Sequence, residues 1–350
     1  MTIDEKYMRR ALQLARQGEC HTSPNPMVGA VIVGPDGTII GEGWHRKCGE
    51  GHAEVNAVAS AKDANLLKDS TLYVTLEPCS HYGKTPPCAR LIIERGIPRV
   101  VVGCLDPFVK VAGRGVAMLR EAGVEVTVGM LEQQCRSLNR RFMTAHEAGR
   151  PWVQLKWAQT ADGYIALPPD AGENPLHMST PVTMCLMHRQ RALCDAIVVG
   201  AATARIDNPS LTTRRWPGQS PLRVVLSRSL SLDGNLNLLT DGLPTVVYNS
   251  IKNEVCGPVE YVKMDTTDSR SWLEDLYRRG VTSVMVEGGS QVLQQIIDSG
   301  LWDEARIEES PRRVEQGVQA PSIDGCQSAC YHIDGNTITI VSPCLTSQPR

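Results

Sequence analysis

The stretch "GHAEVNAVAS" (residues 51–60) places a histidine and a carboxylate two positions apart, at the start of a run of small apolar residues. Side chains two positions apart do not share a face of a regular helix. His52 and Glu54 can therefore act together only where the backbone is just turning into a helix. A third group would then lie between them, and a metal-bound water is one candidate.

Two cysteines downstream extend this pattern. Cys79 ends the apolar segment "STLYVTLEPC" (70–79), and Cys88 opens "CARLIIERG" (88–96). One histidine and two cysteines would leave a fourth, open position on a tetrahedral zinc ion, which is typical of catalytic zinc. Zinc lowers the pKa of a bound water from about 15.7 toward 7, and Glu54 could carry the proton to a leaving amine.

The combination of these motifs is more specific than any one of them. A His-Ala-Glu before a helix, a Pro-Cys at a strand end and a second Cys opening a helix are the layout of zinc nucleoside and base deaminases. Those enzymes have Pro-Cys-x-x-Cys, whereas eight residues, "SHYGKTPP" (80–87), separate the cysteines here. This spacing makes a tRNA or cytidine deaminase less favoured.

Length and composition favour two domains and a small-molecule partner. A chain of 350 residues exceeds what one core usually supports. Its 36 basic and 38 acidic residues give no electrostatic signature for nucleic acid or an anionic membrane. Because we find neither a secretion signal nor an apolar run of roughly 20 residues, we expect a cytoplasmic protein. Most of its 12 cysteines should be ordinary buried side chains or thiols.

The first half alternates helical and strand patterns. An amphipathic segment at 1–19 precedes two apolar runs around a Gly-Pro-Asp-Gly turn within 24–45, which predict a helix and then a β-hairpin. After a helix from about His52, strands are expected at 70–79, 99–107 and 125–129, with helices at 88–96 and 115–123. This order indicates an α/β sandwich whose sheet is largely parallel after the hairpin.

A Gly-Arg-Pro break at 149–151 precedes a second α/β segment, so we expect domains at 1–146 and 147–350. Expected strands lie at 195–203, 221–227, 244–250 and 281–289, expected helices at 182–193 and 290–300, and a hairpin at 331–341. The strand, Gly-Gly turn and helix at 286–297 would direct N–H groups at an anion such as a pyrophosphate. It is not the G-x-G-x-x-G fingerprint, so an ordinary Rossmann domain is not supported.

Together with "TSPNPMVGAVIV" (22–33), the cysteine spacing resembles the bifunctional riboflavin-biosynthesis deaminase-reductase family, and "LKWAQTADGYIA" (155–166) and "DAIVVGAATARIDNPSLTTR" (195–214) extend the resemblance. It implies an α/β protein: a cytidine-deaminase-like three-layer domain followed by a dihydrofolate-reductase-like α/β domain. The implied activities are zinc-dependent hydrolytic deamination of 2,5-diamino-6-ribosylamino-4(3H)-pyrimidinone 5′-phosphate and NADPH reduction of its ribosyl group to ribityl.

The resemblance also implies residue roles. In the first half, one Zn²⁺ is bound by His52, Cys79 and Cys88, with Glu54 as the proton shuttle, and the substrate is contacted by Asn25, His81 and Lys84. In the second half, NADPH is contacted by Ala158, Thr203, Asp207, Gly289, Ser290 and Gln291, and the substrate by Arg191, Leu211, Arg214 and Glu287. The arginines suit a phosphate because a guanidinium offers a bidentate fork. Either Lys156 or Asp207 would transfer the proton during reduction.

The residues alone also fit other interpretations. Without the resemblance, His81 and Lys84 fit an exposed loop, Asn25 a turn and Arg191 a solvated helix face. A deaminase whose C-terminal half is a non-catalytic scaffold or regulatory module would not require Asp207, Arg214, Glu287 and the Gly-Gly turn. A nucleic-acid-editing deaminase would predict a basic surface, whereas the formal net charge is −2. Homo-oligomerisation is left open by the sequence.

Overall fold

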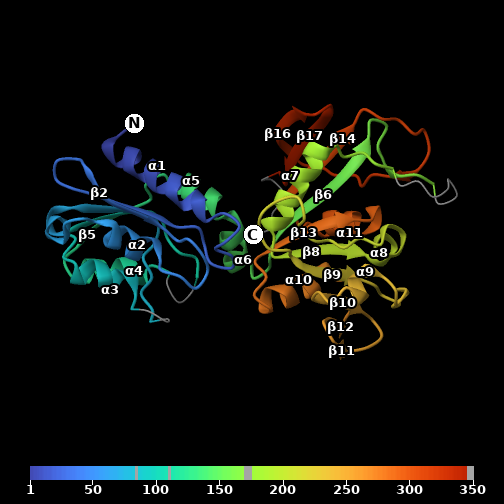
Figure 1. Ribbon diagram of the computed structural model, residues 1–350, viewed down its shortest axis with the longest axis horizontal. Coiled ribbons are helices and arrows are strands. Elements are labelled where there is room, and N and C mark those ends of the chain that lie inside the picture. The colour runs from blue at the N-terminus through green and yellow to red at the C-terminus, as the bar shows by residue number, and fades with distance from the viewer. Residues whose placement is uncertain (83–85, 109–111, 169–175, 345–350) are drawn as a thin grey trace. The chain divides into compact units, whose positions relative to one another are not determined.

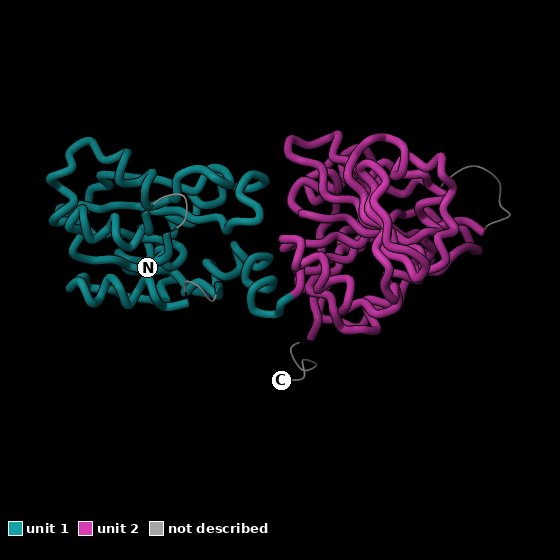
Figure 2. Tube along the Cα trace, turned by 90° about the horizontal axis from the view of Figure 1, so that it is seen from below, with its two compact units in different colours: residues 1–149 teal, residues 150–350 magenta. Residues whose placement is uncertain are grey.

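The chain forms two compact units, residues 1–149 and 150–350, which are drawn in different colours in Figure 2. The computed structural model describes residues 1–82, 86–108, 112–168 and 176–344. Each unit has hydrophobic clusters of its own.

The first unit is built on a five-stranded sheet of order β2-β1-β3-β4-β5. Its strands are β1 (Gly29–Val33), β2 (Ile39–Trp44), β3 (Thr71–Leu76), β4 (Arg99–Cys104) and β5 (Glu125–Val128). β1 is antiparallel to both β2 and β3, whereas β3, β4 and β5 are mutually parallel. The hairpin and the parallel strands that follow it match the arrangement predicted from the sequence.

Helices cover both faces of this sheet and produce three layers (Figure 1). One face carries α2 (Ala53–Ser60), α3 (Cys88–Glu94) and α4 (Arg114–Glu121), and the other carries α1 (Ile3–Ala15), α5 (Glu132–Leu138) and α6 (Arg140–Ala148). Short 3-10 helices occur at Arg16–Gly18 and Ala64–Asp69. Because neighbouring strand residues point to opposite faces, Ile32 packs toward α2 and Val31 toward α1.

Local signals explain how α1 begins and how it packs. The Thr2 hydroxyl accepts the backbone N–H of Glu5, while the Glu5 carboxylate accepts the N–H of Thr2, forming a capping box. Met8 and Ala11 are fully buried against the sheet. A Cβ on Gly29 would lie 2.0 Å from the carbonyl oxygen of Ala11, so glycine permits the close approach of α1 to β1.

The second unit contains a ten-stranded sheet of order β11-β12-β10-β9-β8-β13-β6-β14-β17-β16. Its strands are β6 (Trp152–Thr160), β8 (Ala196–Gly200), β9 (Leu222–Leu226), β10 (Thr245–Asn249), β11 (Glu254–Cys256), β12 (Val259–Lys263), β13 (Ser283–Gly288), β14 (Glu304–Ser310), β16 (Cys326–Ile333) and β17 (Asn336–Ser342). The strands from β12 to β14 are parallel, and antiparallel strands lie at both edges. A separate two-stranded sheet pairs β7 (Tyr164–Ala166) with β15 (Val318–Gln319).

Helices lie on both faces of this larger sheet as well (Figure 1). α10 (Ser269–Arg278) and α11 (Ser290–Ser299) pack on one face, and α8 (Ala201–Asp207) and α9 (Asn237–Thr240) on the other. α7 (Pro181–Ala192) begins after Thr180, whose hydroxyl accepts the N–H of Thr183. No helix in the described ranges has the length and apolar character needed to cross a membrane.

The strand predicted at 195–203 is wrong in its last three residues. β8 ends at Gly200, whose extended backbone is the N-cap of α8, and Ala201 to Thr203 are helical. An early turn is possible because Gly200 has no side chain, and a Cβ there would lie 2.9 Å from Val292 in α11. The turn brings Thr203 next to the end of β13.

Candidate active sites

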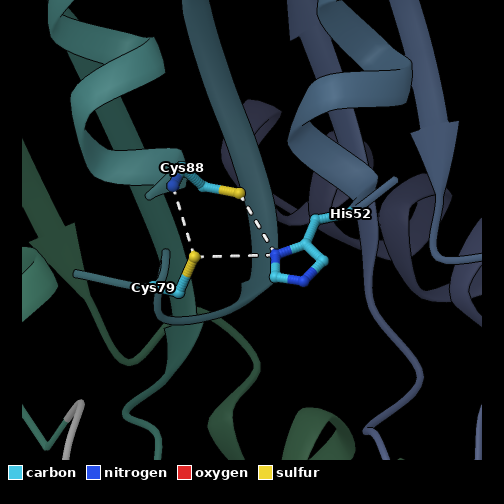
Figure 3. Close-up of side chains that lie close together, drawn as sticks. All are labelled: His52, Cys79 and Cys88. Carbon is cyan, nitrogen blue, oxygen red and sulfur yellow. Dashed lines mark hydrogen bonds between the residues drawn. The ribbon is translucent and has the colours of Figure 1, made fainter. Parts of the chain in front are cut away.

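His52, Cys79 and Cys88 meet where one strand ends and two helices begin (Figure 3). His52 is the N-cap of α2, Cys88 is the first residue of α3, and Cys79 follows β3. His52 Nδ1 lies 3.6 Å from Cys79 Sγ and 3.3 Å from Cys88 Sγ. The backbone N–H of Cys88 also donates to Cys79 Sγ at 3.2 Å. The structure thus brings together the three residues that the sequence predicted as ligands.

This donor set fits zinc in its chemistry and its spacing. The three ligand atoms all lie within 4.8 Å of one another. Zn–S bonds of about 2.3 Å and Zn–N bonds of about 2.0 Å would separate tetrahedral ligand atoms by about 3.5–3.8 Å, close to the observed sulfur–nitrogen distances. Cys88 is buried, and the other two are half-buried. The site can therefore hold the ion while leaving one side open.

The protonation states of the three groups depend on one another. A hydrogen bond from Cys88, supported by His52, lowers the pKa of Cys79 to about 4. The hydrogen bond to Cys79 raises the pKa of His52 to about 9, and Cys88 has a pKa raised above its usual value, chiefly by its hydrogen bond to Cys79. These shifts favour a thiolate at Cys79 beside a protonated His52.

Glu54 lies in the first turn of α2, beside the cluster. Its side chain is only 3% exposed and forms a hydrogen bond with the Cys88 thiol. Burial, followed by the negative charge of Cys79, raises the pKa of Glu54 to about 7. A carboxyl group with a pKa near neutrality can both accept and return a proton.

Asn25 reaches this site through a residue that the sequence analysis missed, His45. Asn25 Nδ2 lies 3.3 Å from His45 Nε2, and His45 Nδ1 lies 3.2 Å from the carbonyl oxygen of Gly51. The His45 ring is buried and packs edge-on to His52, with ring centroids 5.6 Å apart. Donation from Nδ1 to Gly51 would leave Nε2 to accept from Asn25, so His45 links the Asn25 loop to the metal cluster. Its position directly after Trp44, at the end of β2, was the signal available.

The remaining predicted deaminase residues, His81 and Lys84, follow Cys79 in the sequence. His81 is exposed, and its ring lies 6.4 Å from that of Phe108. Lys84 lies outside the described residues. The loop that carries Asn25 is also fixed by Asn139, whose side chain accepts the N–H of Met27 and donates to its carbonyl oxygen, each at 2.8 Å.

In the second unit, Arg191 and Glu287 form a buried ion pair. Arg191 Nε and Nη2 donate to the two carboxylate oxygens of Glu287 at 3.0 and 2.7 Å. A further donation of 3.1 Å from Nη1 to the carbonyl oxygen of Thr212 connects α7 to the 208–214 loop. The structure therefore joins the end of β13, the end of α7 and this loop, and so brings together Arg191 and Glu287, two of the predicted substrate residues.

His188, also missed from the sequence, holds Arg214 in the same region. The backbone N–H of Arg214 donates to His188 Nδ1 at 3.0 Å, and its Nη1 donates to the Thr212 hydroxyl at 2.8 Å. Burial and the charges of Arg191 and Arg214 lower the pKa of His188 to about 4. His188 is therefore neutral near pH 7 and can accept this hydrogen bond.

Four of the six predicted cofactor residues lie around the turn between β13 and α11. Gly289, with φ +71°, is the N-cap of α11, and Ser290 and Gln291 begin that helix. A Cβ on Gly288 would lie 3.0 Å from the Thr203 side chain, so Thr203 packs directly on the turn. The turn leaves backbone N–H groups at a helix start, where the phosphates of a dinucleotide can bind.

Three further predicted residues are more scattered. Asp207 is exposed one helical turn after Thr203, and Leu211 is buried with φ +53° in the following loop. Ala158 is half-buried on β6, the strand between β13 and β14. Asp207 can share a face of α8 with Thr203 because residues four apart are neighbours on a helix.

Comparison with known proteins gives a family match for each half of the chain. Residues 1–104 match the family model "Cytidine and deoxycytidylate deaminase zinc-binding region", and residues 151–324 match "RibD C-terminal domain". The riboflavin biosynthesis protein RibD of Bacillus amyloliquefaciens is 39% identical over 99% of this chain and 97% of its own. The chain belongs to the RibD family of riboflavin biosynthesis proteins.

Other members of this family span the chain in a similar way. RibD from Escherichia coli (strain K12) is 35% identical over 88% of each chain. A crystal structure from Thermotoga maritima, of a diaminohydroxyphosphoribosylaminopyrimidine deaminase/5-amino-6-(5-phosphoribosylamino)uracil reductase, has a TM-score of 0.88 and 36% identity. It covers 98% of this chain and 99% of its own.

Family membership confirms the fold and the bifunctional activity expected from the sequence. The chain is a riboflavin-biosynthesis enzyme that combines a zinc-dependent deaminase with an NADPH-dependent reductase, and its partner is a small molecule. The alternative in which the C-terminal half is only a scaffold is not favoured, because the RibD C-terminal domain matches that half.

Proposed function

We propose that the first unit removes an amino group from 2,5-diamino-6-ribosylamino-4(3H)-pyrimidinone 5′-phosphate and that the second unit then reduces the ribosyl group to ribityl. The observation that carries the first assignment is the cluster of His52, Cys79 and Cys88 beside the buried Glu54. The second assignment rests on the Gly288-Gly289 turn, against which Thr203 packs, and on the adjacent ion pair between Arg191 and Glu287. We assign residues 1–146 to the deaminase domain and residues 147–350 to the reductase domain. We also propose that the protein acts in the cytoplasm.

In the deaminase, His52, Cys79 and Cys88 would hold one zinc ion. When bound, zinc would supply Lewis-acid chemistry that makes a water molecule nucleophilic at neutral pH. Glu54 accepts a proton from the attacking water and returns it to the departing amine, so that water oxygen replaces nitrogen and ammonia leaves. The balance is one water consumed for one ammonia released.

The chain's other residues in this site would bind the pyrimidine and its phosphate. The Asn25 amide can pair with a base edge, because it offers both a donor and an acceptor. His45 holds that amide near the cluster. We assign His81 and Lys84 to the substrate, with the Lys84 ammonium suited to the phosphate.

In the reductase, Arg214 would bind the substrate phosphate. Arg214 is exposed, and its backbone is fixed by His188, whereas Arg191 already donates to Glu287 and Thr212. Arg191 would therefore act by fixing Glu287 toward the substrate. Leu211 would line the same site, and NADPH would contact Ala158, Thr203, Asp207 and residues 289–291.

Conversion of ribosyl to ribityl adds a hydride at C1′ and a proton at the ring oxygen. NADPH supplies the hydride when bound. We assign the proton to Lys156 rather than to Asp207, because Lys156 is half-buried on the central strand β6 and Asp207 is exposed. Lys156 would regain its proton from solvent after each turnover.

The variant Glu54→Gln tests this assignment. It should retain zinc and lose deamination by about 10²-fold or more, which is the scale of a positioned proton-transfer group. Reduction of substrate that has already been deaminated should continue at the wild-type rate. The exposed neighbour Glu50 provides a matched control, and Glu50→Gln should keep both activities. If Glu54→Gln abolished both reactions equally, the assignment to separate sites would be wrong.

A further inference from the structure

A row of polar side chains crosses three adjacent strands of the second sheet. β6 lies between β13 and β14, and Leu155 pairs with Val286 on one side and Ala305 on the other. The next residue of each strand therefore belongs to one row, which contains Glu287, Lys156 and Arg306. Leu155, Val286 and Ala305 belong to the apolar cluster on the opposite face.

Glu308 lies on the same face as this row, two residues after Arg306. Its side chain is only 2% exposed, and it pairs in register with Ala158 of β6. The neighbouring cation in the row, Arg306, forms a hydrogen bond with the Tyr331 hydroxyl, and its guanidinium lies 5.7 Å from the Tyr331 ring centroid. Arg306 and Glu308 are thus both buried although both carry a charge.

Neutral donors hold the Glu308 carboxylate in place. It accepts hydrogen bonds from the Ser179 hydroxyl at 2.8 Å and from Asn336 Nδ2 at 2.7 Å, and Thr183 adds a third. Asn336 also donates to the carbonyl oxygen of Met178 at 2.9 Å. A buried carboxylate is costly unless it is hydrogen-bonded or paired, and these contacts fix it between β17 and the start of α7.

Lys156 lies within electrostatic reach of carboxylates on both flanking strands. Burial opposes ionisation of Glu308, but Thr183 and the charge of Lys156 keep its pKa below the usual value. Burial likewise opposes ionisation of Glu287, and Arg191 and then Lys156 lower its pKa. Glu287 already receives two hydrogen bonds from the Arg191 guanidinium. The side chains that donate hydrogen bonds to Glu308 are all neutral, so none of them balances its negative charge.

We propose that Glu308 is a positioning residue for the reduction: together with Glu287 it brackets the Lys156 ammonium and holds it at the substrate. This inference rests on the proposed role of Lys156 as proton donor to the ring oxygen. One carboxylate alone would draw the flexible lysine side chain to its own side. Two carboxylates on opposite flanks define a position between them, above the centre of β6.

The test is reductase kinetics on the full-length enzyme with deaminated substrate and NADPH. Glu308→Gln should lower kcat by about tenfold or more, a part of the 10²–10⁴-fold that a positioned proton-transfer group contributes. KM for both substrates should change less than about twofold, because Glu308 makes no uniform binding contact. Glu309, the exposed neighbour on β14, provides the matched control, and Glu309→Gln should behave like wild type.

A double-mutant cycle separates positioning from a merely structural role. If Glu308 acts through Lys156, then Lys156→Ala combined with Glu308→Gln should be no slower than Lys156→Ala alone. Independent effects that multiply, or a wild-type kcat for Glu308→Gln, would overturn the inference. Should Glu308→Gln fail to fold, Glu308→Asp keeps the charge. Its kcat should then fall while its melting temperature stays near that of wild type, and an unchanged kcat would again contradict the inference.

Failure of the underlying assignments gives different results. Wild-type enzyme that cannot reduce the deaminated substrate would contradict the proposed function itself. Reduction by wild type together with an unchanged kcat in Lys156→Ala would remove Lys156 as proton donor, and the inference about Glu308 with it. Impairment in Lys156→Ala but not in Glu308→Gln would reject only the inference.

Discussion

The first site depends on a few side chains whose charges are coupled. Cys79, with a pKa of about 4, is a thiolate at neutral pH, and His52, with a pKa of about 9, is an imidazolium. Cys88 keeps its proton because its pKa is raised. Metal binding needs neutral histidine and deprotonated thiols, so zinc must displace protons from His52 and Cys88.

Zinc affinity should therefore increase with pH. With His52 and Cys88 each releasing a proton, the apparent affinity should increase by up to about 100-fold per pH unit below the pKa of His52. Competition with a chelator at several pH values measures this slope, and calorimetry in buffers of different ionisation enthalpy counts the protons. An affinity that is constant from pH 6.5 to 8.5 would contradict the protonation states of His52 and Cys88.

Cys88→Ser should lose zinc. A hydroxyl is a poor zinc ligand, so the loss should exceed the roughly 10- to 100-fold typical of outer-shell substitutions. Metal analysis of purified protein measures the occupancy. Cys48→Ser, at an exposed thiol in the segment before His52, should keep full occupancy. Full occupancy in Cys88→Ser would remove Cys88 from the ligand set.

At the scale of elements, the sequence predicts well what local pattern determines. Two apolar runs around a Gly-containing turn predicted the β1–β2 hairpin, and the motifs that contain His52, Cys79 and Cys88 predicted the metal cluster. His45 and His188 were missed because their partners, Asn25 and Arg214, lie 20 and 26 residues away in sequence. A lone histidine carries no sign of such a contact.

The strand β14 was not predicted either, because two of its buried residues are charged. β14 reads as "EARIEES", a run too charged to suggest a buried strand. Arg306 and Glu308 are nevertheless buried, because Tyr331 and Asn336 from the final hairpin satisfy them. The helices α5 and α6 were likewise not predicted. Their packing on the sheet through Cys135 and Met143 is a tertiary feature that local patterns do not report.

The start of α4 packs against the segment that carries the zinc ligand Cys79, called here the metal loop (residues 77–79). Gly115 should therefore tolerate substitution poorly. A Cβ there would lie 1.9 Å from the carbonyl oxygen of Pro78, the residue before Cys79. The Glu77 carboxylate also accepts the N–H groups of Gly113, Gly115 and Val116 at 2.8, 2.9 and 3.1 Å. α4 and the metal loop are thus in direct backbone contact.

Gly115→Ala should displace this loop. We expect a loss of about 1–3 kcal/mol in stability, as for overpacking in a core, together with weaker zinc binding. Thermal unfolding and metal analysis measure the two effects. Gly234→Ala is the control, because a Cβ at Gly234 meets nothing within 4 Å. Normal zinc affinity in Gly115→Ala would show that the contact does not position Cys79.

His188 should make the second unit sensitive to acid. Its pKa of about 4 in the folded protein lies below the usual 6.5, so the unfolded chain binds the proton more readily. The corresponding stability is present above pH 6.5 and is lost as the pH falls toward 4, by about 2.5 kcal/mol at pH 4.5. Denaturant unfolding of wild type and His188→Asn, which keeps an acceptor but does not titrate, should show a smaller acid loss in the variant. Equal losses would contradict this role.

At the scale of the whole molecule, each unit contains its own sheet and hydrophobic clusters. The first has two clusters within residues 1–149, and the second has two within residues 150–350. Both lengths lie within the usual range of single domains. The proposed deaminase residues all lie in the first unit, and the proposed reductase residues all lie in the second.

A fragment of residues 150–350 should therefore fold, bind NADPH and reduce the deaminated substrate without zinc. Circular dichroism, cofactor titration and NADPH oxidation measure these properties. Within this fragment, Arg214→Ala should chiefly raise KM, because a phosphate contact distant from C1′ contributes mainly uniform binding. A fragment that folds but cannot bind NADPH would show that the first unit completes the cofactor site.

The central claim is that one chain performs both reactions in sequence, and product analysis tests it most directly. Full-length zinc-loaded enzyme is incubated with the diamino-pyrimidinone substrate, with and without NADPH, and the products are resolved by mass spectrometry. Without NADPH, only the deaminated product, with oxygen in place of the amino nitrogen, should accumulate. With NADPH, that product should gain two hydrogens. Failure to deaminate, or a deaminated product that is never reduced when NADPH is present, would contradict the account.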